Sequence, residues 1–500
     1  MVGSVEWTEM GVASGLDHLA MLSPIENFYQ GLVPGFSSIT TRLRHYSFHA
    51  WWVTHNLKHT RITSTDEFDA HVRRIEALYA LACAQHPFET GIAGSRFANR
   101  MLKEGGSDKI DFRAATDLST PRENRYIGPK RGDFPGTYFG QMRECGLLTR
   151  AKEHKMPIPT EIGKMLAEAY EEAFPISIDR FFEVARAGFV DRSELAEMLP
   201  LAPSELNHDG QEAELLREIL IGGDESVDPG SKRRRTLLAI LDVSRKTDRG
   251  AVGQEALRWY WAENEPNGDF FDVHTAWQHY QAADMLRVAY EALMNHAISG
   301  IEESVDGVAM PVLASSLVAD VPDVPFEDWL GTLSALDKNL QQMQEDARGE
   351  EAPLEVIMTV IARLWRKWGP RVSELAESLN AKPGFQTCAT ELSWIEAHRT
   401  MNAREAMGLL LNDRIIRRHL EVAARKLRLQ GGYTYLVELE DARLRARSRI
   451  RVEPSGPRLH TARIFLEDVG LVEDGCITDR GLKYLETHRD TARCRLALRW

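Results

Sequence analysis

The sequence predicts a mainly α-helical fold with small β-wings, in which two winged-helix modules flank a helical region. Three observations favour it: helical periodicity dominates the 500 residues, strict alternation is rare, and one helix–hairpin–helix pattern occurs twice. A chain of this length exceeds one ordinary core. We therefore expect an N-terminal helical domain over 1–135, a winged helix over 136–176, a helical domain over 177–430 and a second winged helix over 431–500.

Composition limits the class of protein. The chain is 43% hydrophobic and 27% charged, with a net charge of -13. It contains no apolar run of about 18 residues, no basic and apolar leader, and no CxxC pair among its five cysteines. The simplest interpretation is a cytoplasmic protein with no membrane contact, disulfide framework or cofactor. A nucleic-acid binder of this charge would have to gather its basic residues on one face.

The stretch "LVPGFSSITTRLRHYSFHAWW" is the first strong motif. Its Pro-Gly turn and two serines precede apolar residues spaced by three and four from Ile39 to Leu57, which predicts a helix of about five turns. A second stripe on this helix contains Arg42, His45, His49 and Trp52. This stripe is either packed and salt-bridged or lines a cleft. We expect Arg42, His45 and His49 to reach a groove shared with the segment Glu123–Tyr138.

Two later segments, Tyr138–Tyr170 and Thr461–His488, share one pattern. A helix ends at a glycine, a strand–turn–strand follows, and a threonine is placed to cap a second helix with a further glycine in its first turn. These positions are Gly146, Thr160 and Gly163 in the first segment and Gly470, Thr478 and Gly481 in the second. The layout is that of a winged helix, which serves either DNA binding or protein–protein contact.

Two basic runs allow more than one interpretation. Lys232–Arg235 follow an acidic loop and form either a solvated surface or a phosphate contact. Arginine also occupies every second position from Arg443 to Arg451, so in a strand all five side chains would share one face. This row either binds phosphates or forms an internal salt-bridge network with the acidic chain.

Several common catalytic motifs are missing from the sequence. There is no GxxxxGK[ST] loop, no GxGxxG after a strand, no GxSxG elbow and no HExxH. ATP-driven and nicotinamide-dependent chemistry are therefore not expected. His45 and His49 have the i, i+4 spacing that metals use, but without a surrounding motif no metal site is predicted.

The residues "YQGLVPGFSSITTRLRHYSFHAWW", preceded by "VEWTEM", resemble a bacterial family associated with phage-defence islands, whose signature is YQ-LLPG-SN-T-R-RYYSFY-W. The matching positions are Trp7, Tyr29, Gln30, Pro34, Gly35, Ser37, Thr40 or Thr41, Arg42, Arg44, Tyr46, Ser47, Phe48 and Trp51. His45 replaces a tyrosine and Ser38 an asparagine of that signature, and Phe134–Met142 resembles a later segment of it. The arrangement also looks like that of tandem winged-helix DNA glycosylases, although their QxQ-type motif is not evident.

The resemblance implies an antiphage defence protein that binds double-stranded DNA, including modified phage DNA. A DNA glycosylase that flips out and excises a modified base, such as glucosylated hydroxymethylcytosine, is the favoured activity; a non-catalytic DNA-binding or adaptor subunit is the alternative. A glycosylase needs a group that positions water, aromatic rings for the base and arginines for phosphates. The catalytic candidates are Gln30, Glu123 and Asp133, although the two carboxylates can equally pair with neighbouring basic groups. The candidates for binding DNA or substrate are Arg42, Arg44, His45, Tyr46, His49, Trp52, Arg125, Lys130, Arg131, Tyr138, Arg445, Arg447 and Arg449.

Overall fold

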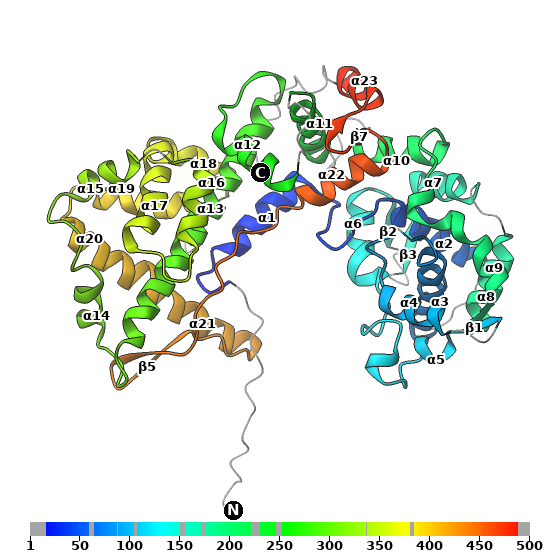
Figure 1. Ribbon diagram of the computed structural model, residues 1–500, viewed down its shortest axis with the longest axis horizontal. Helices are drawn as coiled ribbons and strands as arrows, with labels where there is room; N and C mark the ends of the chain where they lie inside the picture. The colour runs from blue at the N-terminus through cyan, green and yellow to red at the C-terminus, as the bar shows by residue number, and fades with distance from the viewer. Residues whose placement is uncertain are drawn as a thin grey trace, which may run out of the picture. The chain divides into compact units, whose positions relative to one another are not determined.

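The structure, a computed structural model, describes residues 17–59, 65–87, 89–104, 108–150, 156–172, 176–221, 231–246, 253–336, 338–380 and 385–488. Trp7, the acidic loop 222–230 and the C-terminal residues 489–500 lie outside these ranges. The described part is mainly helical with four two-stranded antiparallel sheets, which confirms the predicted fold class at this level (Figure 1). Within it, no helix combines the length and apolarity needed to cross a membrane.

The chain divides into two compact units, each built from separate stretches of sequence. Among the described residues, unit 1 comprises those from 17 to 29 and from 258 to 457, and unit 2 comprises those from 30 to 257 and from 458 to 488. This division differs from the four consecutive domains expected from the sequence, because both helix–hairpin–helix segments belong to unit 2. Helices α1 (Leu22–Leu32) and α12 (Gln254–Glu263) each contain a boundary between the units.

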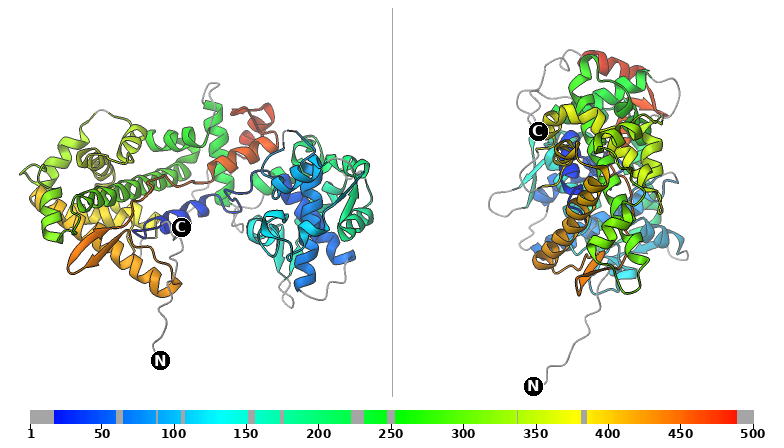
Figure 2. Two further views of the ribbon diagram at one scale, coloured as in Figure 1. Left: turned by 60° about the horizontal axis from the view of Figure 1, so that its bottom comes forward. Right: turned by 90° about the vertical axis from the view of Figure 1, so that its left-hand side faces the viewer.

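Unit 1 is organised around the long helix α13 (Phe271–Glu302) (Figure 2). This helix is buried on nearly every side, and α14, α16, α17 and α19 pack against it. The remaining helical elements of the unit are η5 (Gly268–Phe270), α14 (Met310–Leu317), α15 (Phe326–Ser334), α16 (Leu340–Ala347), α17 (Leu354–Trp368), η6 (Gly369–Arg371), α18 (Val372–Ser378), α19 (Cys388–His398), α20 (Ala403–Leu409), the π-helical η7 (Leu410–Ile416) and α21 (Arg417–Gln430). Strands β5 (Val437–Glu440) and β6 (Arg443–Ala446) form its hairpin.

Unit 2 contains the N-terminal motif and three of the small sheets. Its helices are α2 (Arg44–His59), α3 (Thr65–Cys83), α4 (Ser95–Lys103), α5 (Arg113–Thr116), η1 (Arg122–Asn124), the π-helical η2 (Phe134–Tyr138), α6 (Phe139–Glu144), α7 (Glu161–Glu171), α8 (Ile178–Ala187), α9 (Arg192–Glu197), η3 (Leu199–Leu201), η4 (Pro203–Glu205), α10 (Gln211–Ile221), α11 (Ser231–Lys246), α22 (Leu459–Asp468) and α23 (Asp479–His488). Its strands pair as β1 (Lys109–Asp111) with β4 (Phe189–Asp191), β2 (Leu148–Arg150) with β3 (Pro157–Pro159), and β7 (Val472–Glu473) with β8 (Cys476–Ile477).

The helix of the N-terminal motif begins later than the sequence predicts. It starts at Arg44, and Ile39, which we expected on its apolar face, is 65% exposed. The Ser37 hydroxyl accepts the N–H of Ile39, two residues on, and so forms a local turn instead of a helix cap. The N–H of Leu43 donates to a carboxylate oxygen of Asp468 at 2.7 Å. A contact from a distant part of the sequence therefore accompanies the start of the helix.

The two predicted repeats have the same element order in the structure. The first is α6, β2, β3 and α7, and the second is α22, β7, β8 and α23. In each, the threonine hydroxyl accepts the N–H of the glycine three residues on and donates to the carbonyl of the glycine that follows the first helix. The hydroxyl-to-carbonyl distances are 2.6 Å for Thr160–Gly146 and 2.8 Å for Thr478–Gly470. The pattern thus encodes a shared local structure.

Three arginines of the basic run, which lies in the first turns of α11, are not surface residues. Arg233, Arg234 and Arg235 are 2%, 2% and 4% exposed, so the predicted solvated surface or phosphate contact is wrong. Arg233 donates to the backbone carbonyls of Pro34 and Ile219 at 2.9 and 2.8 Å. The arginines are buried because α11 packs between α10, α22 and α23.

A glycine in the first turn of each second helix allows the hairpin to pack closely. A Cβ at Gly163 would lie 2.1 Å from the carbonyl oxygen of Leu147. We expect Gly163→Ala to destabilise the protein by about 1–3 kcal/mol, because the obstructing atom belongs to the backbone and cannot rotate away. The urea unfolding midpoint measures this effect.

Gly140→Ala in α6 is the matched control, since a Cβ there meets nothing within 4 Å. It should leave the midpoint unchanged or raise it, by up to about 1 kcal/mol in stability. Equal midpoints for the two variants would contradict the packing argument.

Candidate functional site

The two arginines of the N-terminal motif are held by carboxylates inside unit 2. Arg42 pairs with Glu89 and with Asp468, each at 2.8 Å. Arg44 is 1% exposed and donates to both carboxylate oxygens of Glu212 and to two backbone carbonyls. Removing one partner of such a buried pair typically costs about 3–5 kcal/mol. In this structure both guanidiniums are engaged within the protein.

The histidines of α2 meet the predicted loop segment in a buried cluster. The ring of His49 lies 4.2 Å from that of Tyr138, measured between centroids, and the ring of His45 lies 5.7 Å from it. His45 Nδ1 is 3.0 Å from the hydroxyl of Tyr79 on α3. Both histidines, Tyr138 and Asp133 line one small cavity. The structure therefore brings together four of the residues selected from the sequence.

A glutamate that the sequence analysis did not select fixes this cluster. Glu76 on α3 accepts the backbone N–H of Asp133 at 2.9 Å and that of Phe134 at 2.6 Å, using a different oxygen for each. The preceding Gly132 has φ +79°, and a Cβ there would lie 2.4 Å from the Glu76 carboxylate. Glu76 thereby holds the turn that carries Asp133 and leads into the π-helical turn η2, a distortion that is frequent at functional sites.

Burial governs the protonation of these groups. It raises the pKa of Glu76 to about 8, against the opposing effect of the two N–H donors. It also raises the pKa of Asp133, lowers that of His45 to about 3 and lowers that of His49. The histidines are thus neutral at neutral pH. Since His49 Nδ1 accepts the indole N–H of Trp52 at 2.8 Å, the proton of the neutral His49 ring lies on Nε2.

The cavity between these side chains has a volume of about 10 Å³, which is room for one water molecule. His49 supplies a donor at its wall and Asp133 an acceptor. The Oδ1 atom of Asp133 accepts the Thr137 hydroxyl at 2.8 Å, and no described contact uses Oδ2. A donor and a half-buried carboxylate can orient a water and take a proton from it. A nucleobase does not fit this space as it stands.

The other residues selected from the sequence lie outside the cavity wall. Tyr46 and Trp52 are fully buried, and the Tyr46 hydroxyl donates to the carbonyl of Gly35. Gln30 lies half-buried on α1, and Glu123 is exposed in η1. The basic residues of the loop lie as follows: Arg125 donates to the carbonyls of Thr120 and Leu118, Lys130 is exposed, and Arg131 lies 3.5 Å from Asp69.

The arginine row of unit 1 is only partly a strand. β6 ends at Ala446, so only Arg443 and Arg445 share a strand face. The ion pairs of the row are Arg445–Glu440, Arg447–Glu438, Arg449–Glu302 and Arg451–Glu453, and Arg443 donates to the carbonyl of Gly307. The sequence allowed two interpretations of this row, phosphate binding and an internal salt-bridge network. The contacts in the structure are those of a salt-bridge network. The side chains remain accessible, since those of Arg445, Arg447 and Arg449 are 46%, 38% and 36% exposed.

The sequence contained a signal for Glu76. It is a lone carboxylate in "HVRRIEALYALAC", a stretch in which the neighbouring apolar residues occupy every face of the helix. A charged residue buried in such a helix requires hydrogen-bond donors from another segment. Its partners, the N–H groups of residues 133 and 134, could be identified only from the structure.

Comparison with known proteins gives no assignment: no family model matches the chain, and neither the curated proteins nor the solved structures yield a match.

The raised pKa of Glu76 predicts a pH-dependent stability. Glutamates in the unfolded chain titrate near 4.5, so the folded protein holds the Glu76 proton more tightly, and loss of that proton costs the folded state. Glu76 should therefore lower stability as the pH rises from about 4.5 to about 8, by up to about 1.4 kcal/mol per pH unit. The difference in melting temperature between Glu76→Gln and the wild type should therefore shift in favour of the variant as the pH rises through this range.

Glu168→Gln on α7 is the control, because Glu168 is exposed. Its melting temperature should differ from that of the wild type by the same amount at every pH. A parallel pH dependence of Glu76→Gln and wild type would contradict the prediction.

Proposed function

We propose that the protein binds double-stranded DNA in antiphage defence and acts as a DNA glycosylase that excises a modified base. The resemblance of the N-terminal motif supports the defence role. The two helix–hairpin–helix repeats, which we propose to be winged-helix modules, support DNA binding. The observation that carries the enzymatic proposal is the buried cluster in which Asp133 and His49 border a cavity with room for one water.

In this proposal each residue of the cluster has a distinct role. Cleavage of an N-glycosidic bond needs an activated water and stabilisation of an oxocarbenium-like sugar. The Nε2–H of His49 orients the water, and Asp133 takes its proton. The water oxygen bonds to the sugar carbon as the N-glycosidic bond breaks, and the base departs with the electron pair of that bond. Glu76 is a positioning residue, since both its oxygens accept backbone N–H groups of the turn that carries Asp133. A nucleobase needs more room than this cavity has, and Ile92 and Ala93 are among the residues that line it.

A non-catalytic DNA-binding or adaptor subunit is the second candidate. The size of the cavity favours it, because a space for one water cannot hold an extruded base. In this case the cluster stabilises unit 2, and DNA contacts come from basic side chains elsewhere. The hairpin β7–β8 contributes little to these DNA contacts, since its exposed residues Glu473 and Asp474 repel phosphate.

Incubation of the purified protein with modified and unmodified DNA, followed by heating in alkali, tests the enzymatic proposal. Strand breaks that appear only after alkali reveal abasic sites. We expect Asp133→Asn to lower their rate of formation by about 10²–10⁴-fold, the usual contribution of a general base, and Glu168→Gln to leave it unchanged. Binding without abasic sites supports the adaptor, whereas breaks without alkali contradict both candidates.

DNA affinity should depend locally on the arginine row. Replacing Arg445, Arg447 and Arg449 together with glutamine removes up to three phosphate contacts, each worth about 0.9 in the slope of log affinity against log salt. The slope should therefore flatten by about two to three units, equally for all base sequences.

The control variant replaces Arg371, Arg399 and Arg417 with glutamine, since these arginines of unit 1 are also exposed and ion-paired. It should leave the salt slope unaltered. A lowered melting temperature with an unchanged slope in the Arg445, Arg447 and Arg449 variant would assign the row to internal ion pairing alone.

A further inference from the structure

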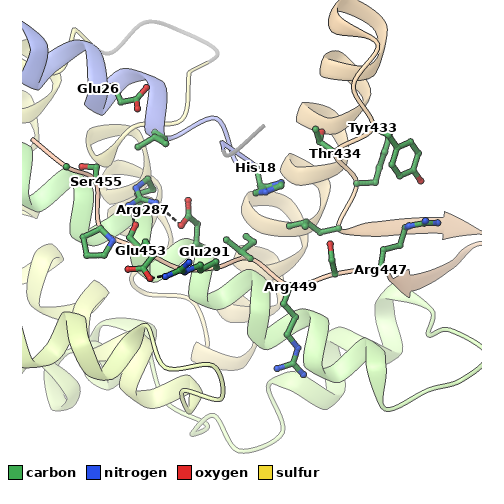
Figure 3. A pocket seen from close by; sticks show the side chains of 18 residues that line it. His18, Glu26, Arg287, Glu291, Tyr433, Thr434, Arg447, Arg449, Glu453 and Ser455 are labelled. Atoms are coloured by element: carbon green, nitrogen blue, oxygen red, sulfur yellow. Dashed lines mark hydrogen bonds and ion pairs between the residues drawn. The ribbon is translucent and has the colours of Figure 1, made fainter. Parts of the chain in front are cut away.

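Unit 1 contains a cavity of about 730 Å³, within the range of small-molecule sites. The start of α1, the helix α13, the residues before β5 and an extended segment, Arg447–Gly456, line it (Figure 3). None of its lining residues belongs to the cluster around Asp133. It is therefore a separate candidate site with room for a ligand.

The extended segment is a fixed wall of this cavity. The side-chain amide of Asn295 on α13 bonds both the N–H and the carbonyl of Ile450, each at 2.8 Å. Further along the helix, Arg287 donates to the carbonyl of Glu453 at 2.6 Å, and Asp284 accepts the N–H of Ser455. Side chains on one face of a single helix thus hold the segment in place and define one wall of the cavity.

The floor of the cavity offers a buried acceptor. Glu291 is 2% exposed, and its Oε2 accepts an N–H of Arg287 at 2.7 Å. No contact of the described residues uses its Oε1. Glu291 borders the cavity, so a ligand N–H placed at Oε1 gains a hydrogen bond to a carboxylate. The guanidinium of Arg287 fixes which oxygen of Glu291 is available (Figure 3).

The wall formed by the extended segment offers donors. Arg447, Arg449 and Arg451 line the cavity and are 38%, 36% and 89% exposed. Each guanidinium has five N–H groups, yet Arg447 and Arg451 each make one described bond to a carboxylate and Arg449 makes two. Guanidinium groups with unused donors suit a phosphate, whose oxygens accept several N–H bonds at once. The ring of Tyr433 lies 5.4 Å from the Arg447 guanidinium and adds a flat apolar surface.

We propose that this cavity binds a nucleoside phosphate whose base carries an exocyclic amino group, with the amino group on Glu291 and the phosphate on the arginines of the extended segment. Adenine, cytosine and guanine carry such a group, and thymine does not. The proposal goes beyond the action on DNA, because the ligand can be a free mononucleotide. A free mononucleotide and a nucleotide within a strand present the same amino and phosphate groups to the cavity. It does not depend on the cluster around Asp133.

Calorimetric titration of the full chain with the four deoxynucleoside 5′-monophosphates tests the proposal. We expect dAMP, dCMP and dGMP to bind about tenfold or more tightly than dTMP, which lacks the donor for the Glu291 carboxylate. Inorganic phosphate should bind more weakly than any of these three. Absence of mononucleotide binding, or phosphate binding as tight as that of dAMP, would overturn the proposal.

Glu291→Gln gives a sharper test than loss of binding. Arg287 donates only, so it should hold the amide oxygen and turn the amide NH2 toward the cavity. The preference should then shift toward dTMP, whose base presents an acceptor at the corresponding position. A melting curve checks that the variant is folded. An unchanged order of affinities in a folded variant would overturn the assignment of Glu291.

Replacing Arg447 and Arg451 with glutamine should weaken all four nucleotides and reduce the salt dependence of their binding. Arg443→Gln is the matched control, because Arg443 is an exposed member of the same row that does not line the cavity. Equal affinities of the double variant and the control would overturn the phosphate assignment.

Competition with a single-stranded oligonucleotide separates the two sources of the ligand. If the strand displaces the mononucleotide more effectively than an equal concentration of free nucleotide, the cavity serves a strand; if not, it serves free nucleotides. Both outcomes require that the mononucleotide binds. Because that binding is measured without DNA, a protein that forms no abasic sites and binds no duplex can still bind nucleotides here.

Discussion

The rest of the structure depends on two helices, α2 and α13. Both are buried on nearly every side and yet carry polar side chains. A buried charge or hydrogen-bonding group without a partner costs several kcal/mol, so each of these side chains requires a contact from another segment. On α2, Arg44 binds Glu212 of α10. On α13, Asn295 binds the backbone of Ile450. Segments far apart in the sequence are thereby fixed by the polar groups of one helix in each unit.

The same constraint produces both candidate sites. Glu76 satisfies two backbone N–H groups and so positions Asp133 beside the histidines of α2. On α13, Arg287 and Glu291 satisfy each other only in part and leave one carboxylate oxygen at a cavity. The first site has carboxylates but room for a single water, whereas the second has room for a ligand. Catalysis at the first site and ligand binding at the second can therefore be tested independently of each other.

For the proposed DNA interface, the acidic balance of the chain limits which arginines are available to phosphates. Arg445, Arg447 and Arg449 each pair with a carboxylate, yet they remain at least one-third exposed. Exposed ion pairs contribute about 0–1 kcal/mol, so exchanging a carboxylate for a phosphate costs little. Arg44 and Arg233, by contrast, are buried and cannot exchange partners without unfolding their surroundings. Burial, which the sequence does not display, separates structural from available arginines.

The sequence alone determined the features whose causes are local. Helical periodicity predicted the mainly helical class, and the glycine and threonine spacing predicted the two helix–hairpin–helix repeats, because caps and tight turns act within a few residues. Part of the first site was also predictable, since the two histidines and the Glu123–Tyr138 segment do meet through His49, Asp133 and Tyr138. Only the tertiary structure decided the start of α2, the burial of Arg233–Arg235, the role of Glu76 and the cavity at Glu291. Each of these depends on a partner tens to hundreds of residues away, and spacing along the chain carries no record of which distant segment supplies it.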